Sequence, residues 1–501
     1  MKSGHHIDNP DIILIGSGIM SSTLGTMLKE LDPTTKIQLY EMTEGLAEEA
    51  SNGWHNAGTG HAGICELSYT PNYGPDGEVD VAKAIEIFQQ FEHSKQFWGY
   101  AARTGMISDI HEFINPVPHL SFVYGQEQVD FLRSRHRQMQ AHHFFESMEY
   151  TEDRDTLREW APLLLEGRDD TPIAATKMNL GSDVNFGALV QKFVTWLGQQ
   201  ENCGFACSHR VIDLTQQEDH RWSLKIKNLK TGHIFTNTAK FIFVGAGGGS
   251  LPLLQKSGIR ESKGFGGFPI GGQWLICDKP EIVEKHVAKV YGMSPGAAPT
   301  MAVPHLDTRI IRGKKSLLFG PYAAWTTKFL HIEGKFTDLP GSIRADNIAS
   351  LIKVGLHNLP LVRYLIQQGT QSMDTRMKEL RAFFPDAQVN DWKLIDAGIR
   401  VQAIKKEDGD AGIVHFGTEV LTSEDRSISA LLGASPGASV SANIILEVIK
   451  KCFADILTTE DGHQRMKAMI PSYDEDLSGP EFADRQRSLS VEAFKSLHFI
   501  K

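Results

Sequence analysis

The sequence predicts an α/β protein in which a Rossmann-like, dinucleotide-binding domain is discontinuous along the chain and is joined to an α+β domain with a mixed or antiparallel β-sheet. Three observations predict this class. A strand–turn–helix–strand unit occupies residues 11–41, a second strand enters a glycine cluster at residues 240–250, and residues 268–391 alternate strands with helices. The expected division is a cofactor domain at 1–79, 183–267 and 392–455, a substrate domain at 80–182 and 268–391, and a C-terminal segment at 456–501.

Length and charge limit the possible functions. A chain of 501 residues is too long for one simple core, so two closely joined domains are expected. The formal net charge of −10 leaves no basic surplus to neutralise phosphates, which argues against general nucleic-acid binding. An anionic substrate would therefore need its own local arginine or lysine residues.

Cysteine usage and hydropathy indicate the cellular setting. The five cysteines are odd in number and lack paired metal-ligand spacing, so they are expected to be reduced thiols in a cytosolic protein, and no metal site is expected. The polar start MKSGHHIDNP has no apolar signal core. No run approaches the roughly 20 apolar residues that cross a bilayer, so any membrane contact is expected to be peripheral.

The first unit has the features of a nucleotide-binding βαβ fold. Residues 12–15 (IILI) form an apolar run that is typical of a parallel strand covered on both faces. Gly16 turns the chain, and Gly18 allows the backbone to approach a pyrophosphate at the N-terminus of a helix predicted over residues 19–31. The next strand, residues 36–40, leads to Glu41, whose carboxylate can accept hydrogen bonds from both ribose hydroxyls.

One position departs from the usual glycine pattern. Ser21 stands where a third glycine is common, although a small residue there still permits close packing of the helix on the strand. A glutamate at position 41 suits an adenosine ribose without a 2′-phosphate. These residues leave FAD and NAD as the candidates and disfavour NADP.

A loop rich in small residues follows Glu41. Residues 48–69 (EEASNGWHNAGTGHAGICELSY) can lie against a flat ligand and offer backbone amides. His61 lies in this loop. A single loop histidine is often a surface or structural residue, but this loop directly follows the ribose-binding acid and must pass near the cofactor.

Two later segments also contain glycine-rich turns that could contact the cofactor. The strand in KFIFVGAGGGS (residues 240–250) would re-enter the parallel sheet beside the cofactor, with an ordinary tight turn as the alternative. A Gly/Ser/Ala-rich turn enters another helix at residues 432–449, where anion binding is again expected. Between these parts the patterns predict helices over residues 80–105 and 127–140, an antiparallel meander within 210–236, a β-ribbon around Gly313, and strands at residues 396–405 and 415–420.

Several blocks of sequence resemble one enzyme family. They are GSGIMSSTLGTMLKELDP, SNGWHNAGTGHAGICELSYTP, FVGAGGGSLPLLQKSGI, GGFPIGGQW, VPHLDTR with LLFGPYA, and GASPGASVSA. In this order, from about residue 11 to beyond 470, they resemble malate:quinone oxidoreductases. The resemblance implies FAD as the cofactor, oxidation of (S)-malate to oxaloacetate, electron transfer to a membrane quinone, and peripheral attachment to the inner face of the cytoplasmic membrane. No obligate protein partner is indicated.

The glycine turns and the resemblance together give a set of expected FAD contacts. These are Gly16, Gly18, Ile19, Met20, Glu41, Ser51, Asn52, Asn56, Ala57, Gly58, Thr59, Val211, Gly245, Ala246, Gly247, Gly433, Ser435, Gly437, Ala438 and Ser439.

The reaction determines which residue types the substrate site needs. Oxidation of a secondary alcohol needs a base for the hydroxyl proton, and neutral His61 or His305 can serve because histidine titrates near working pH. A dicarboxylate needs cationic partners, for which Arg309 and Arg400 are the candidates and Lys328 is a further one. For each of these residues a structural role or a surface ion pair is the alternative.

Two other functions fit the same fold. A related 2-hydroxyacid or amino-acid oxidase would use oxygen, form peroxide and respond weakly to quinone analogues. A non-enzymatic flavin-binding protein would hold FAD without being reduced by any hydroxy acid. The VPHLDTR and LLFGPYA blocks favour the malate:quinone reaction over both.

Overall fold

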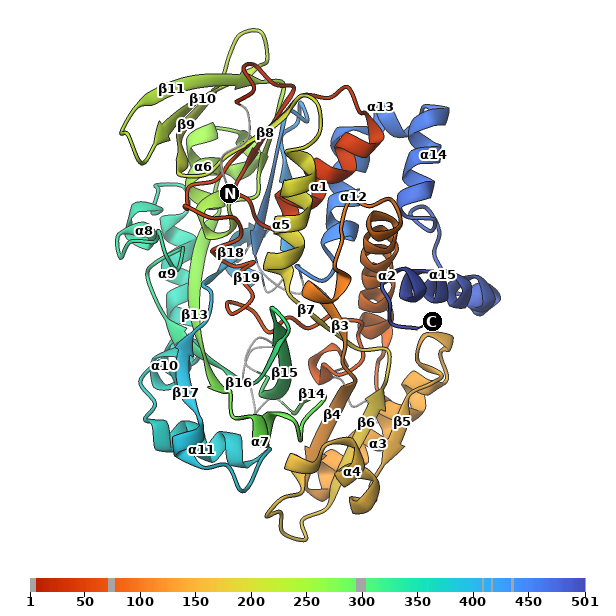
Figure 1. Cartoon of the computed structure of the whole chain (residues 1–501). Helices are drawn as coiled ribbons and strands as arrows, with labels where there is room; N and C mark the ends of the chain where they lie inside the picture. The colour runs from red at the N-terminus through yellow and green to blue at the C-terminus, as the bar shows by residue number, and fades with distance from the viewer. Residues whose placement is uncertain are drawn as a thin grey trace.

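The computed structural model describes residues 6–70, 77–293, 303–357, 359–407, 410–415, 418–433 and 437–500. The fold is built around a six-stranded sheet, a three-stranded sheet and a ten-stranded sheet, with helices packed on their faces (Figure 1).

The six-stranded sheet is the nucleotide-binding sheet predicted from the first βαβ unit. Its strand order is β20–β21–β12–β1–β2–β8, and all neighbouring strands are parallel except β20 and β21. The strands are β1 (Ile12–Ile15), β2 (Ile37–Tyr40), β8 (Cys203–Ala206), β12 (Phe241–Val244), β20 (Thr418–Thr422) and β21 (Ile428–Gly433). The strand in residues 240–250 therefore re-enters the parallel sheet, as predicted, where it pairs with β1.

Both faces of this sheet are covered, which explains the continuous apolar run of β1. Ile12 and Leu14 pack in the core formed with helices α1 (Ile19–Leu31), α5 (Phe186–Leu197) and α12 (Ser441–Cys452). Ile13 and Ile15 pack in a second core with helix α6 (Ser250–Ser257) and the three-stranded sheet. That sheet is the predicted meander, formed by β9 (His209–Gln216), β10 (Trp222–Asn228) and β11 (Ile234–Ala239).

The ten-stranded sheet is mixed but mainly antiparallel. Its order is β19–β18–β13–β16–β15–β14–β4–β6–β5, with β17 also paired to β13, and only β14 and β4 are parallel. The strands are β4 (His119–Tyr124), β5 (Glu149–Thr151), β6 (Ile173–Met178), β13 (Gly266–Cys277), β14 (Lys289–Tyr291), β15 (His305–Ile311), β16 (Lys314–Trp325), β17 (Lys393–Asp396), β18 (Arg400–Glu407) and β19 (Asp410–His415). The predicted ribbon around Gly313 is the β15–β16 hairpin.

The remaining helices and one short strand pair surround these sheets. Helix α15 packs against α2, and the N- and C-terminal parts of the chain thereby share one core. The remaining elements are α2 (Ala82–Arg103), α3 (Gln126–Gln140), α4 (Arg154–Trp160), α7 (Pro280–Val283), α8 (Asp338–Gly341), α9 (Ile348–His357), α10 (Leu359–Gly369), α11 (Met373–Arg381), α13 (Ala454–Leu457), α14 (Glu460–Met469), α15 (Ala483–Ser496), β3 (Ile114–Pro116) and β7 (Ser182–Val184).

Strand pairing corrects one expectation about the last third of the chain. Residues 392–455 were expected in the cofactor domain; within this range β20 and β21 pair in the nucleotide-binding sheet, while β17, β18 and β19 join the ten-stranded sheet, because the long strand β13 has room to pair with both β17 and β18. The strand expected at residues 415–420 is two strands, since β19 ends at His415 and β20 begins at Thr418 in the other sheet. Apolar patterns do not reveal which sheet a strand joins. The division into cofactor and substrate domains stays a prediction.

Candidate active site

One pocket of about 250 Å³ opens where the loops after β1, β2, β12 and β21 meet the loop of residues 47–61. The loops at the carboxyl ends of parallel strands are where α/β sheets bind ligands. Nearly all expected FAD contacts line this pocket: Gly16, Gly18, Ile19, Met20, Glu41, Ser51, Asn56, Ala57, Gly58, Thr59, Val211, Gly245, Ala246, Gly247, Gly433, Gly437, Ala438 and Ser439. Asn52 does not line it, and Ser435 lies outside the described residues.

The turn after β1 brings two glycine segments into contact. Gly16 has a φ of +89°, and a Cβ there would lie 2.7 Å from the carbonyl oxygen of Gly245. The hydroxyl of Ser21 fills the space where a side chain at residue 245 would lie. The serine that replaces the third glycine is therefore accommodated by the absence of a side chain on the neighbouring strand's turn.

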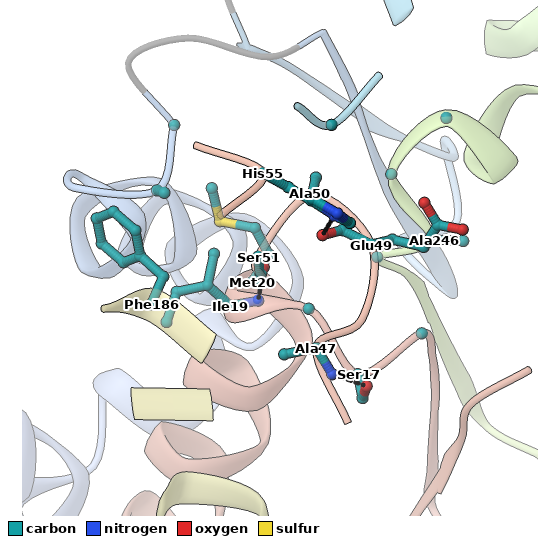
Figure 2. Close-up of a pocket in the computed structure, with 18 of the residues that line it drawn as sticks. Ser17, Ile19, Met20, Ala47, Glu49, Ala50, Ser51, His55, Phe186 and Ala246 are labelled. Carbon is teal, nitrogen blue, oxygen red and sulfur yellow. Dashed lines mark hydrogen bonds between the residues drawn. The ribbon is translucent and has the colours of Figure 1, made fainter. Parts of the chain in front are cut away.

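The N-terminus of α1 presents free donors to the pocket. The amide of Ile19 donates to Ser51 Oγ at 3.0 Å, as Figure 2 shows. Within the described chain, the amides of Gly18, Met20 and Ser21 donate to no acceptor. Unpaired amides together with the positive end of the helix dipole form an anion-binding site suited to a pyrophosphate.

Glu41 is held rigidly at the edge of the pocket. Its Oε2 accepts hydrogen bonds from the amide and the hydroxyl of Ser17, both at 2.7 Å. Its Oε1 accepts two more from the amide and the hydroxyl of Thr43, both at 2.8 Å. These four bonds fix the orientation of a carboxylate that lines the pocket, where a ribose is expected.

The loop of residues 47–61 is stabilised by its own polar residues. Asn56 donates to the carbonyls of Ala50 and Asn52 and accepts from the amide of Gly58. Asn52 accepts from the amide of Trp54, so its side chain shapes the turn and does not face the pocket. Asn52 is therefore an expected FAD contact that does not line the pocket.

Arg309 does not face the pocket, which corrects its expected role as a substrate-binding cation. Its side chain is fully buried and donates to the carbonyl of Gly53 at 2.7 Å and to Asp183 Oδ1 at 2.7 Å. The guanidinium lies directly against Gly58, where φ is +63° and a Cβ would clash with it. Arg309 therefore supports the pocket loop from the side that faces away from the pocket.

A second buried cation supports the same loop. Lys289 Nζ donates to the carbonyl of Ala57 at 2.8 Å and lies 2.9 Å from Asp183 and 3.4 Å from Asp307. All four charged residues of this cluster, Asp183, Lys289, Asp307 and Arg309, are completely buried. Sequence reasoning missed the lysine, although a single lysine in the apolar stretch VAKVYG was a signal of a buried charge.

His305 lies behind the pocket and not on its surface. Its Nδ1 is 2.9 Å from Asp307 Oδ2, and its ring stacks on Tyr291 with centroids 4.3 Å apart. Despite burial, the charges of His305 and Lys289 lower the pKa of Asp307 to about 2. The structure therefore separates His305 from the pocket, which corrects its candidacy as the base that contacts substrate.

His61 and Arg400 are the two candidate catalytic residues that do line the pocket. Burial, with the nearby charges of His119, His305 and Lys289, lowers the pKa of His61 to about 3. The rings of Tyr69 and Tyr291 lie 6.2 and 6.0 Å from the His61 ring. The guanidinium of Arg400 forms no ion pair or hydrogen bond with any described residue, and burial lowers its pKa. A neutral imidazole and an unpaired cation thus share one end of the pocket.

The sequence as a whole matches one family. A family model described as malate:quinone oxidoreductase (Mqo) matches residues 8–495. The chain belongs to the malate:quinone oxidoreductase family. A "probable malate:quinone oxidoreductase" of Hahella chejuensis is 49% identical over 489 residues, which cover 97% of this chain and 98% of that protein. The resemblance recognised in the sequence blocks is therefore confirmed.

Solved structures show the same fold at low sequence identity. L-α-glycerophosphate oxidase from Mycoplasma pneumoniae, solved with FAD bound, matches with a TM-score of 0.55 and 15% identity over 89% of this chain and 95% of that one. Glycine oxidase from Geobacillus kaustophilus matches with a TM-score of 0.56 and 14% identity over the same shares of the two chains. The predicted fold class, with a Rossmann-like domain and a second β-sheet, is confirmed.

No cluster of three or more His, Cys, Asp or Glu side chains among the described residues could hold a metal ion. None of the helices in the described ranges is both long enough and apolar enough to cross a bilayer.

Proposed function

We propose that this chain binds FAD in the pocket described above, oxidises (S)-malate to oxaloacetate, and passes the electrons to a membrane quinone. Membership of the malate:quinone oxidoreductase family along residues 8–495 is the observation that carries the proposal. The pocket supports it independently, because the residues expected to bind a dinucleotide (the cradle) line the same cavity as the candidate base His61 and the candidate cation Arg400.

The residues of the cradle fit FAD. The amides of Gly18, Met20 and Ser21, which donate to no described residue, suit a pyrophosphate, and the fixed carboxylate of Glu41 suits a ribose without a 2′-phosphate. FAD, when bound, supplies the two-electron acceptor for the hydrogen on the carbinol carbon of malate. Every other part of the reaction depends on side chains of this chain.

Arg400 binds a substrate carboxylate in this proposal. Its guanidinium lines the pocket and is without a partner among the described residues, so it can form a bidentate, charge-assisted pair without first breaking another interaction. Pairing with a carboxylate would also offset the burial of its own charge. A substrate held here lies at the same end of the pocket as His61.

His61 accepts the hydroxyl proton of malate. With a pKa of about 3 in the substrate-free protein, its imidazole is neutral at working pH and available as a base. Proton uptake creates an imidazolium near Lys289 and Arg400, which is unfavourable until the negative charges of a bound dicarboxylate balance it. The base is thereby strengthened when the correct substrate is present.

We also propose peripheral association with the inner face of the cytoplasmic membrane. The family description includes a quinone acceptor, and quinones that serve membrane electron transfer are dissolved in lipid. Such an enzyme must reach the bilayer surface without necessarily crossing it.

An anaerobic visible spectrum of the purified protein tests the proposal. Addition of (S)-malate should bleach the flavin bands, and a soluble quinone analogue should restore them. A bound flavin that malate does not bleach would reject malate as the substrate. Rapid reoxidation by oxygen with peroxide release, and slow reoxidation by quinone, would instead favour the oxidase function.

A further inference from the structure

A group of exposed apolar side chains covers one side of the ten-stranded sheet. We define the apolar patch as Trp325, Ile332, Phe336, Ile343, Ile348, Ile352 and Ile366, whose side chains are between 43 and 73% exposed. They lie between the end of β16 and helix α10, and α8, α9 and α10 run along the left side of Figure 1.

The two longer helices of this region carry exposed isoleucines as well as buried apolar residues. Leu351 and Val354 of α9 pack with Leu365 of α10 on β13, β16 and β18, which accounts for their inner faces. Ile348 and Ile352, one turn apart on α9, are exposed, as is Ile366 on α10. A helix that faces only water is normally polar on its outer side. The exposed isoleucines of α9 and α10 are therefore suited to contact with an apolar neighbour.

Cationic residues share the segment of the chain that carries the apolar patch. Residues 325–366 contain Lys328, Lys335, Arg344, Lys353 and Arg363, in a chain whose net charge is −10. Lys328 Nζ lies 4.8 Å from the centre of the Phe336 ring.

Three acidic residues share this segment. Glu333 pairs with Arg210, while Asp338 and Asp346 accept backbone amides. The segment therefore carries more cations than carboxylates beside its exposed apolar residues, which suits an anionic phospholipid surface.

The apolar patch is continuous with the cofactor pocket. Leu330 lines the pocket, and two residues further along the chain Ile332 is exposed on the patch. The carboxylate of Glu49, another pocket residue, accepts the amides of His331, Ile332 and Glu333 at 2.7, 2.9 and 3.1 Å. One short loop therefore reaches from the cofactor site to the exposed surface.

We propose that the apolar patch is the surface by which this protein docks on a bilayer that contains anionic phospholipids. The proposal rests on the proposed function in one respect, because a lipid-dissolved quinone gives the docked enzyme its electron acceptor. The apolar side chains enter the acyl boundary and the cations contact lipid phosphates. Docking in this way brings the Leu330 end of the pocket next to the membrane.

Sedimentation of the FAD-loaded protein with vesicles tests the docking surface. The double variant Phe336→Glu, Ile352→Glu should bind phosphatidylglycerol-containing vesicles at least about tenfold more weakly than the unsubstituted protein, because two apolar anchors are replaced by charges. The matched control is Ile234→Glu, Val287→Glu, which alters two similarly exposed apolar residues on other elements. This control should bind vesicles like the unsubstituted protein.

A variant that removes one positive charge separates the electrostatic part of vesicle binding from the apolar part. Lys335→Gln should weaken binding to anionic vesicles by about fivefold and leave binding to neutral phosphatidylcholine vesicles unchanged. Failure of the unsubstituted protein to bind vesicles, or equal loss in the control double variant, would overturn the proposal. Loss of a dimer in F336E/I352E, seen by sedimentation velocity without vesicles, would instead assign the surface to a second copy of the chain.

Catalysis with a soluble quinone distinguishes failure of the docking surface from failure of the proposed function. The F336E/I352E variant should reduce a short-chain, soluble quinone with malate at the unsubstituted rate, because neither residue lines the pocket. It should lose activity with a long-chain quinone embedded in vesicles. No malate oxidation in any variant would overturn the proposed function, while the vesicle-binding result would still decide the docking surface.

Discussion

At the scale of single residues, Arg400 carries the most specific consequence, because it is a cation that lines the pocket without a partner in the described chain. Arg400→Met should raise KM for malate by about tenfold to a hundredfold, since a hydrogen-bonded charge pair contributes about 1.5–3 kcal/mol. Arg400→Lys should recover part of this loss because it keeps the charge but not the bidentate geometry. Steady-state kinetics at equal flavin content would measure both, and an unchanged KM in Arg400→Met would remove Arg400 from the substrate site.

The low pKa of His61 predicts how kcat/KM depends on pH. Because its pKa is about 3 in the substrate-free protein, His61 stays neutral above about pH 4, and kcat/KM should show no acid limb from this residue between pH 5 and 8. His61→Asn should lower kcat by about a hundredfold to ten-thousandfold while flavin content is retained. A pH profile of kcat/KM with an acid limb near pH 6.5 that disappears in His61→Asn would contradict the low pKa.

At the scale of elements, the buried charges join a strand pair to a loop. Arg309 on β15 and Lys289 on β14 each donate to carbonyls of residues 53–57, and both contact Asp183. Removal of one member leaves a buried charge without its partner, which costs about 3–5 kcal/mol.

Lys289→Met should therefore lower the thermal midpoint and weaken FAD retention together, because the loop that lines the pocket loses its support. Lys315→Met is the matched control, since Lys315 forms an ion pair with Glu284 on the surface and should change stability by less than about 1 kcal/mol. Thermal unfolding and the flavin-to-protein absorbance ratio would check both effects. Full flavin retention in Lys289→Met would show that the loop does not depend on this lysine.

The same elements show which features a single sequence reveals. The turn at Gly16, the carboxylate of Glu41 and the strand before Gly245 were predictable because their signals are local and repeat a known spacing. The role of Arg309 was not, because its partners Gly53 and Asp183 lie far away in the sequence. The pairing of β18 in the ten-stranded sheet was not predicted for the same reason. Hydrophobic periodicity indicates that a strand is buried but not which strand it pairs with.

At the scale of the whole molecule, buried histidines set its response to acid. Burial lowers the pKa of His286, which is fully buried and does not line the pocket, to about 4. The unfolded chain binds a proton near pH 6.5, whereas the folded chain does so only near pH 4. The unfolded state is therefore favoured as the pH falls through this window, by about 1.4 kcal/mol per pH unit for this one residue.

His286→Gln should flatten this part of the acid response. The glutamine can still donate to the carbonyl of Leu306, which His286 Nε2 contacts at 3.1 Å, but it cannot be protonated. The drop in the urea midpoint of the holoenzyme between about pH 7 and pH 5 should be smaller than in the unsubstituted protein. An equal drop in both proteins would show that His286 does not contribute to acid sensitivity.

The strand order of the nucleotide-binding sheet also has a consequence for synthesis of the chain. β1 is made near the beginning, yet one of its two neighbours, β12, comes from residues 241–244, and β21 beside β12 comes later still. At roughly 5–20 residues per second, about ten to fifty seconds separate the emergence of β1 and β12 from the ribosome. During that interval the backbone N–H and C=O groups on one edge of β1 lack the strand that pairs with them in the folded sheet, which leaves this edge open to pairing with other chains.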